Sequence, residues 1–107
     1  MAVEFHDLEV AGIVQETHDT RSFIFNVPAA LRAQFVYQAG QFLTFEIPFN
    51  GMRIRRCYSL ASAPEIDGWH KVTVKRVNGG RVSNWFNDTL KVGDKIAVQA
   101  PEGRFVI

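Results

Sequence analysis

Residues 52–60 read Met-Arg-Ile-Arg-Arg-Cys-Tyr-Ser-Leu and have the pattern of a β-strand. Because successive side chains of a strand point to opposite faces, Ile54, Arg56 and Tyr58 would share one face. At ~3.3 Å of rise per residue, the Arg56 guanidinium and the Tyr58 ring would lie about 7 Å apart. This pair suits a ligand with a phosphate at one end and a flat ring at the other, as in a flavin nucleotide. The alternative for such a strand taken alone is an edge strand with a solvated basic face.

Further strand-like runs lie on both sides of this stretch. Asn50-Gly51 is a strong signal for a two-residue hairpin turn, so residues 41–49 and 52–60 are expected to form paired strands. The other runs rich in β-branched and aromatic residues predict strands at 8–16, 22–27, 69–77 and 95–100.

One helix and one connector complete the expected fold. Residues 82–90 place their apolar side chains on one helical face, which predicts a helix there. Residues 29–39 are expected to be a connector with one helical turn around Leu31. Six strands at short intervals with one helix predict an all-β fold, a six-stranded antiparallel Greek-key barrel, closed on itself and capped by the short helix.

The start of this helix carries a second chemical signal, Gly79-Gly80-Arg81-Val82-Ser83. The glycines let the backbone take a positive φ and approach a ligand closely. The unpaired amides and the dipole at a helix N-terminus favour an anion such as a phosphate or pyrophosphate. The alternative is an ordinary strand-to-helix turn in which Ser83 is an N-terminal residue. In a barrel, this turn and the Arg56–Tyr58 strand could converge on one groove.

Composition limits the possible functions. A chain of 107 residues with a net charge of +1 is one domain without the basic bias of a nucleic-acid binder. No apolar stretch is long enough to span a membrane, and the N-terminus lacks the pattern of a signal peptide, so a cytoplasmic protein is expected. One cysteine cannot ligate an iron–sulfur cluster. The three histidines have no ligand spacing, so no metal site is expected.

Four short motifs follow one another along the chain. They are Arg56-Cys57-Tyr58-Ser59, Leu60-Ala61-Ser62-Ala63-Pro64, Thr73-Val74-Lys75-Arg76 and Gly80-Arg81-Val82-Ser83. In this order they resemble the flavin domain of the ferredoxin–NADP reductase superfamily, with its Arg-x-Tyr-Ser/Thr and later Gly-x-x-Ser/Thr motifs. The nearest types are bacterial flavohaemoglobin, hybrid-cluster and oxygenase reductases. The resemblance covers nearly the whole chain.

The resemblance implies a role for each motif in holding FAD. Tyr58 would lie against the isoalloxazine ring and Ser59 would place its hydroxyl near flavin N5, so these two are the expected catalytic residues. Arg56 would bind the flavin phosphate through charge-assisted hydrogen bonds. Cys57 fills the variable position of this cofactor-binding motif and is expected to pack on the opposite face. The polar edge of the flavin and the pyrophosphate would be bound by Thr73, Val74, Lys75, Gly80, Arg81, Val82 and Ser83.

The resemblance also implies an activity that this chain would not complete alone. Residues 1–107 are expected to be the FAD-binding barrel domain of a longer NAD(P)H-dependent reductase, whose nicotinamide-binding domain is absent. FAD is favoured over FMN, and the electrons would pass to an iron–sulfur or haem partner. Arg53 and Arg55, on the face opposite Arg56, would be solvated or would bind an acidic partner or a nicotinamide nucleotide. Alternatives are a flavin-binding module without redox turnover and a small-barrel module that binds oligonucleotides.

Overall fold

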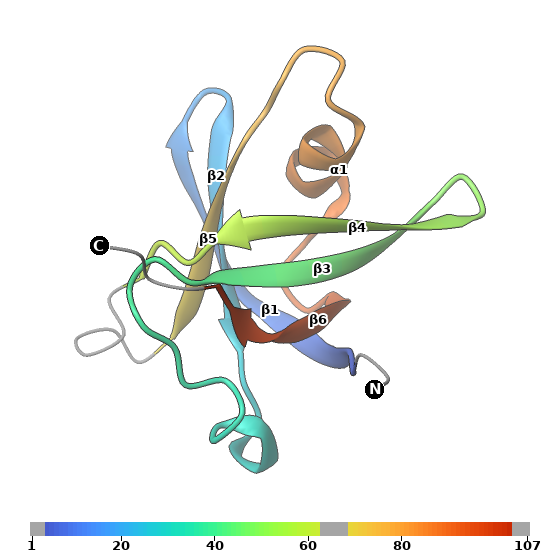
Figure 1. Ribbon diagram of the computed structural model, residues 1–107. Helices are drawn as coiled ribbons and strands as arrows, with labels where there is room; N and C mark the ends of the chain where they lie inside the picture. The colour runs from blue at the N-terminus through green and yellow to red at the C-terminus, as the bar shows by residue number, and fades with distance from the viewer. Residues whose placement is uncertain (1–3, 63–68, 104–107) are drawn as a thin grey trace.

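The described part of the chain forms one antiparallel sheet and one α-helix around an aromatic core (Figure 1). The computed structural model describes residues 4–62 and 69–103. Within these ranges the elements follow the predicted order. They are β1 (His6–Thr17), β2 (Thr20–Asn26), the 3-10 turn η1 (Ala29–Leu31), β3 (Phe42–Phe49), β4 (Met52–Ser59), β5 (His70–Lys75), α1 (Arg81–Thr89) and β6 (Lys95–Glu102).

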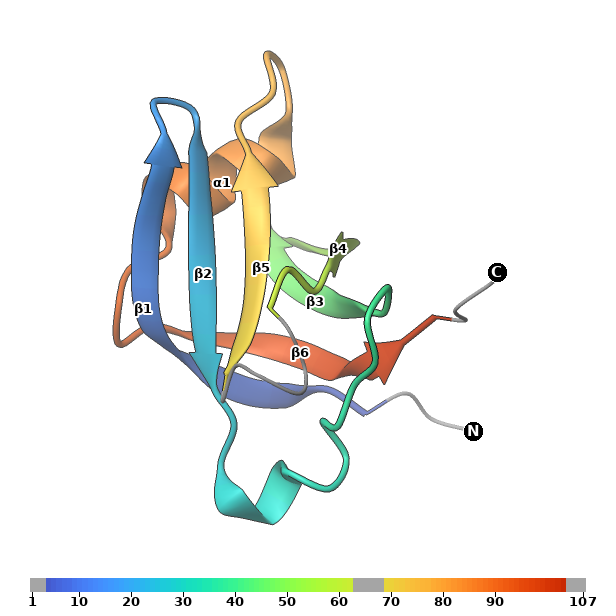
Figure 2. The same ribbon diagram turned by 90° about the vertical axis from the view of Figure 1, so that its left-hand side faces the viewer.

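The strands lie in the order β4-β3-β6-β1-β2-β5, and every described pair is antiparallel. Figure 2 shows the sheet curving, with the last strand, β6, crossing between elements from earlier in the chain. This insertion of β6 between β3 and β1 gives the predicted Greek-key connection. The β3–β4 hairpin turns at Asn50 and Gly51, which both have positive φ (51° and 74°), as expected for this dipeptide.

The sheet is not closed into a full barrel, which corrects one detail of the prediction. Its two edge strands, β4 and β5, meet at one isolated bridge, Leu60 with Val72. Next to this bridge the amide of Ala61 donates to the Lys71 carbonyl at 2.7 Å. Elsewhere the gap is filled by α1, because Phe86 packs its ring against Tyr58 of β4 at a centroid distance of 5.2 Å. The helix therefore replaces direct strand pairing over part of the closure.

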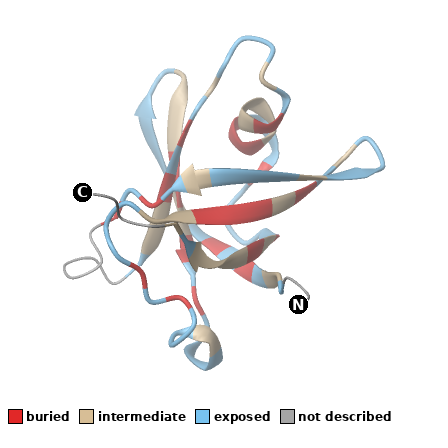
Figure 3. Ribbon diagram, viewed as in Figure 1, coloured by how far each residue is buried: buried red, intermediate tan, exposed pale blue. Residues whose placement is uncertain are grey.

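Aromatic side chains dominate the interior. Phe23, Phe25, Phe45 and Phe86 are at most 1% exposed, and neighbouring ring centroids lie 5.3–5.5 Å apart. Buried positions alternate with exposed ones in β5 and the first half of β1, whereas β3 has three buried residues in a row and β4 has none. Figure 3 shows the long buried stretch of β3 and the buried face of α1. The alternation expected of a strand with one face on the core is thus clear in β5 and the first half of β1.

The helix buries the apolar face that the sequence predicted. Its buried side chains include Val82 and Phe86, and Leu90 just beyond the last turn is also buried. Trp85 is half-buried and packs edge-on against Phe86, with ring centroids 5.5 Å apart. The apolar positions at three- and four-residue spacing therefore point α1 into the core. No helix in residues 4–62 and 69–103 is long and apolar enough to cross a membrane.

Some strand boundaries differ from those predicted. Strand β5 excludes Trp69 and Val77, and β1 begins at His6. Strand β6 continues through Pro101, where a stop was predicted. The described pairing of β6 with β1 covers only residues 95–98, so Pro101 lies where β6 is paired on one side, a position that tolerates a missing amide hydrogen. Residues 63–68, which include Ala63 and Pro64 of the second motif, and residues 104–107 lie outside the described part of the chain.

Candidate flavin-binding site

The two motifs meet in one open groove of about 580 Å³. The groove lies between β4, the end of β5 and the start of α1. The convergence predicted for the Arg56–Tyr58 strand and the glycine turn is therefore confirmed. Its lining residues are Ile54, Arg56, Tyr58, Lys75, Val77, Gly79, Gly80, Arg81, Val82 and Ser83.

Tyr58 forms the aromatic wall of the groove. Its register in the hairpin places it opposite Leu43, and its ring packs against Phe86 at 5.2 Å and Phe45 at 6.1 Å. Ile54 and Arg56 line the groove on the same face of β4, as strand alternation predicted. Phe86 and Phe45 hold the Tyr58 ring from the core side, so its position does not depend on a ligand.

Arg56 presents an uncompensated positive charge to the groove. Its Nη1 donates to the Arg55 carbonyl at 2.8 Å, and no described carboxylate lies within ion-pair distance of it. Arg53 and Arg55 behave differently, because both bind the Glu46 carboxylate, at 2.7 and 3.3 Å, on the opposite face of the hairpin. This pairing supports the interpretation of these two arginines as a charged surface edge and leaves Arg56 available for an anion.

The start of α1 forms the opposite wall. Gly79 has a φ of 75°, which favours glycine, and Gly80 is the N-cap without a side-chain hydrogen bond to the first turn. A Cβ on Gly80 would lie 2.7 Å from Ser83 Oγ and 3.0 Å from Val77 Cβ. A side chain at Gly80 would thus displace the Ser83 hydroxyl and crowd Val77, so close packing favours glycine here although its φ is an ordinary −80°. The first-turn amides of Arg81, Val82 and Ser83 have no partner within an α-helix, so they can bind an anion.

Comparison with known proteins fits this geometry. A model of the oxidoreductase FAD-binding domain family matches residues 7–107. The chain belongs to this family. The ferredoxin reductase component of 3-ketosteroid-9-alpha-monooxygenase from Rhodococcus rhodochrous is 48% identical over 99 residues, and the match covers 92% of this chain and 28% of that protein. The glycine betaine monooxygenase reductase subunit of Pseudomonas aeruginosa is 38% identical, and the match covers 94% of this chain and 27% of that protein.

Solved structures give the same result for the fold. The FAD/NAD-binding domain of nitric oxide dioxygenase from Vibrio cholerae superposes with a TM-score of 0.82 at 31% identity, covering 99% of this chain and 46% of that one. Phthalate dioxygenase reductase superposes with a TM-score of 0.76 at 30% identity, covering 96% of this chain and 31% of that one. The match to the two curated relatives in the preceding paragraph spans less than a third of their length.

Four of the predicted FAD-binding residues do not line the groove. Cys57 points to the other face, where Sγ and Thr44 Oγ1 are 3.3 Å apart, as its place in the strand predicted. Ser59 is exposed at the end of β4. Thr73 bonds Ser22 through their hydroxyls at 2.8 Å, and Val74 is fully buried. The groove also includes Ile54 and Gly79, which belong to the two sequence signals but were not assigned to FAD binding, and Val77, which the sequence did not single out.

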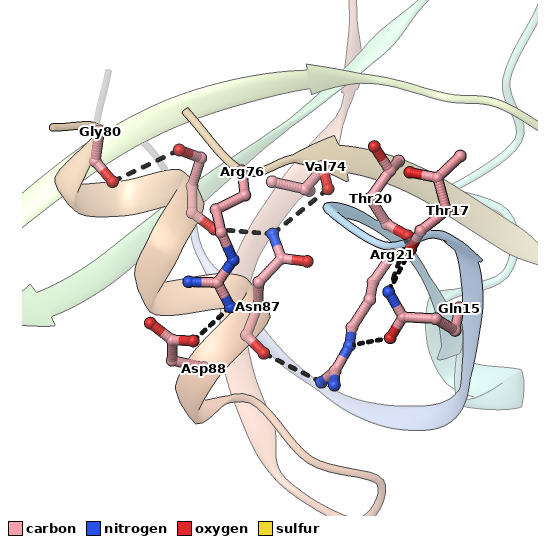
Figure 4. A network of polar contacts seen from close by, with 10 residues as sticks. Gln15, Thr17, Thr20, Arg21, Val74, Arg76, Gly80, Asn87 and Asp88 are labelled. Carbon is pink, nitrogen blue, oxygen red and sulfur yellow. Dashed lines mark hydrogen bonds and ion pairs between the residues drawn. The ribbon is translucent and has the colours of Figure 1, made fainter. Parts of the chain in front are cut away.

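The carbonyl of Val74 is already used inside the protein. It accepts a hydrogen bond from Asn87 Nδ2 of α1 at 3.3 Å (Figure 4). The predicted contact between the backbone of β5 and the flavin edge therefore competes at this atom with an internal bond. Asn87 was not identified from the sequence, since a single polar residue on a short helix has no pattern that distinguishes it from a solvated one.

The ionisation of Tyr58 offers a test of the groove in the free protein. Burial raises the pKa of its phenol above the ordinary value of 10.0, and the Arg56 guanidinium partly opposes this rise. The neutral phenol is thus favoured by folding, so its contribution to stability is complete below pH about 10 and is lost as the pH rises through the folded-state pKa. We expect the ultraviolet difference between wild type and Tyr58→Phe to show ionisation above that value, and Arg56→Ala to move it higher still. Ionisation at or below the ordinary pKa would contradict the buried setting.

Proposed function

We propose that this chain is the FAD-binding domain of an NAD(P)H-dependent reductase that relays electrons to an iron–sulfur or haem partner. The observation that carries the proposal is the convergence of Arg56 and the uncapped start of α1 on one groove beside the Tyr58 ring. A guanidinium and a row of helix amides suit phosphate oxygens, and an aromatic wall suits a flat ring. The two relatives described above, a ferredoxin reductase component and a reductase subunit of monooxygenases, support the same activity.

Different residues of the groove would bind different parts of FAD. Arg56, Lys75 and Arg81 supply positive charge, and the amides of residues 81–83 supply directed donors for the pyrophosphate. Tyr58 would support the ring system, and Ser59 at the end of the same strand would place its hydroxyl near the reacting edge. Bound FAD would accept a hydride from NAD(P)H and release electrons singly. The protein would thus bind, orient and shield the cofactor.

The relatives are longer than this domain, and their additional residues would contain the other domains of the reductase. Because the match covers only 27–28% of those relatives, we propose that a nicotinamide-binding domain completes the enzyme. The electron acceptor would be an iron–sulfur or haem protein in the cytoplasm. Residues 1–107 are proposed as one domain of that longer chain, with FAD preferred to FMN because the groove offers charge and amides for more than one phosphate.

Titration with FAD tests the proposal directly. Quenching of flavin fluorescence and the visible spectrum of the gel-filtered protein should both report a complex of one FAD per chain. FMN, with one phosphate, should bind more weakly, because it forms fewer charge-assisted hydrogen bonds. A colourless protein that leaves the fluorescence of added FAD unchanged would refute the proposed function, and salt-dependent binding of an oligonucleotide would favour the small-barrel alternative.

A further inference from the structure

A buried polar side chain connects the two parts of the groove that come from β5 and α1. Asn87 lies one turn after Ser83 and is only 3% exposed. Its Nδ2 donates to the Ser83 carbonyl at 2.9 Å and to the Val74 carbonyl at 3.3 Å (Figure 4). Val74 directly precedes Lys75, and both Lys75 and Ser83 line the groove. One amide group thus joins the strand and the helix next to their groove residues.

The main chain of Asn87 is held as well. Its carbonyl accepts a hydrogen bond from Arg21 Nη1 of β2 at 2.9 Å, and Arg21 Nε donates to Gln15 Oε1 at 2.6 Å. The next residue, Asp88, forms an ion pair with Arg76, which follows β5. Figure 4 shows these bonds on the side of α1 that faces β2 and β5. Asn87 is therefore fixed to two strands at once.

The start of α1 is anchored by the buried side chain of Val82 but has no comparable polar tie in the described part of the chain. Gly80 caps the helix without a side-chain bond, and Ser83 Oγ reaches only the Gly80 carbonyl within the same turn, at 3.4 Å. A helix moves as a rigid unit over its length, so a bond at Asn87 also sets where the first turn lies. The orientation of the free amides in the groove thus depends on the packing of Val82 and on the hydrogen bonds made at Asn87.

We propose that Asn87 is a positioning residue that holds the first turn of α1 against β5 in the orientation needed to bind the cofactor pyrophosphate. The inference rests on the proposed FAD-binding function. The amide is suited to this role because its two N–H groups match two carbonyl oxygens. An Asp at this position would point carboxylate oxygens at those carbonyls, and a Leu would leave both without this donor.

Replacement of Asn87 should weaken FAD binding without preventing folding. We expect Asn87→Asp and Asn87→Leu to raise the Kd for FAD about tenfold, the effect of misplacing one charge-assisted hydrogen bond. Arg21→Ala removes the charge-assisted bond to the Asn87 carbonyl and leaves the Asn87 side chain intact. It should raise the Kd about threefold, because the helix keeps both hydrogen bonds of the Asn87 amide. In amide NMR spectra without FAD, the signals of residues 81–83 should shift in all three variants.

Two controls separate positioning from stability. Val98→Ala removes core volume on β6, outside the groove, so it should lower the unfolding temperature and leave the Kd for FAD within about twofold. Asn84→Leu changes the same residue type on the same helix, at a side chain whose Oδ1 has no described partner, and should leave the Kd equally unchanged.

The outcomes test the positioning role of Asn87 and the FAD-binding function separately. An Asn87 variant that changes the Kd no more than Val98→Ala overturns the positioning role, as does an unshifted first-turn spectrum. If Asn87→Leu does not fold, Asn87→Asp and Arg21→Ala decide by the same two measurements. Wild-type protein that binds no FAD overturns the proposed function, and the amide shifts of residues 81–83 then still show whether Asn87 orients the helix start.

Discussion

Replacement of Arg56 by alanine is expected to weaken FAD binding about 10- to 150-fold, the equivalent of losing a hydrogen bond to a charged group worth about 1.5–3 kcal/mol. The side chain lines the groove and has no described carboxylate partner, so its charge is available to a phosphate. The fold should not change, because Arg56 is exposed and its one described bond is to the neighbouring carbonyl. Fluorescence titration with FAD measures the change in Kd.

The same strand offers a matched control for Arg56. Arg53 and Arg55 lie on the face of β4 opposite Arg56. The Arg53 side chain is 77% exposed and binds Glu46, outside the groove. Arg53→Ala should therefore leave the Kd for FAD within about twofold, as expected for an exposed ion pair. Arg56→Lys should give an intermediate Kd because the charge remains and the planar fork is lost. Equal effects of Arg56→Ala and Arg53→Ala would show that general surface charge, and not a phosphate contact, governs binding.

Replacement of Phe86 by alanine is expected to destabilise the domain by about 3–5 kcal/mol, as for other fully buried phenylalanines. The ring is 0% exposed and packs against four aromatic side chains with centroids 5.2–5.5 Å away. It also fills the gap that β4 and β5 leave in the sheet, so its loss opens a cavity between the helix and the edge strands. The free energy of unfolding in urea measures the effect.

Phe86 also supports the groove, which gives the prediction a second readout. Because Phe86 lies behind Tyr58, its removal should loosen the aromatic wall and weaken FAD binding in the protein that remains folded. Trp69→Ala is the control, since this aromatic side chain is 45% exposed and lies outside the groove. It should cost much less stability and leave the Kd for FAD unchanged. A Phe86→Ala protein as stable as Trp69→Ala would contradict the assignment of Phe86 to the closure of the sheet.

Much of the fold could be predicted because the relevant preferences act over a few residues. Strand alternation placed Ile54, Arg56 and Tyr58 on one face, and the structure confirms it. The Asn50-Gly51 pair predicted a hairpin, because both residues tolerate positive φ. The spacing of apolar residues predicted α1 and the face that it buries. Each of these signals is complete within one element.

The rest depended on atoms that are far apart along the chain. The end of β6 was predicted too early, at Pro101. A proline is accepted in this strand because β1 no longer pairs with β6 there, and no local pattern shows where that pairing stops. The opening between β4 and β5 depends on the Phe86 ring packing against Tyr58, which no local pattern specifies. Among the predicted site residues, Val74 is buried and its carbonyl is bound by Asn87, because the helix packs on this strand.

The sequence alone established the two chemical motifs, their strand and helix settings, and the kind of ligand that an arginine, a tyrosine and a glycine turn can bind together. The tertiary structure decided that Arg56 and the start of α1 face one groove, that Ser83 and Val77 crowd the position of Gly80, and that Asn87 joins helix to strand. The physical reason is distance along the chain. Propensity and alternation are local, whereas the bond from Arg21 to Asn87 joins residues 66 positions apart and exists only after α1 has packed beside β2.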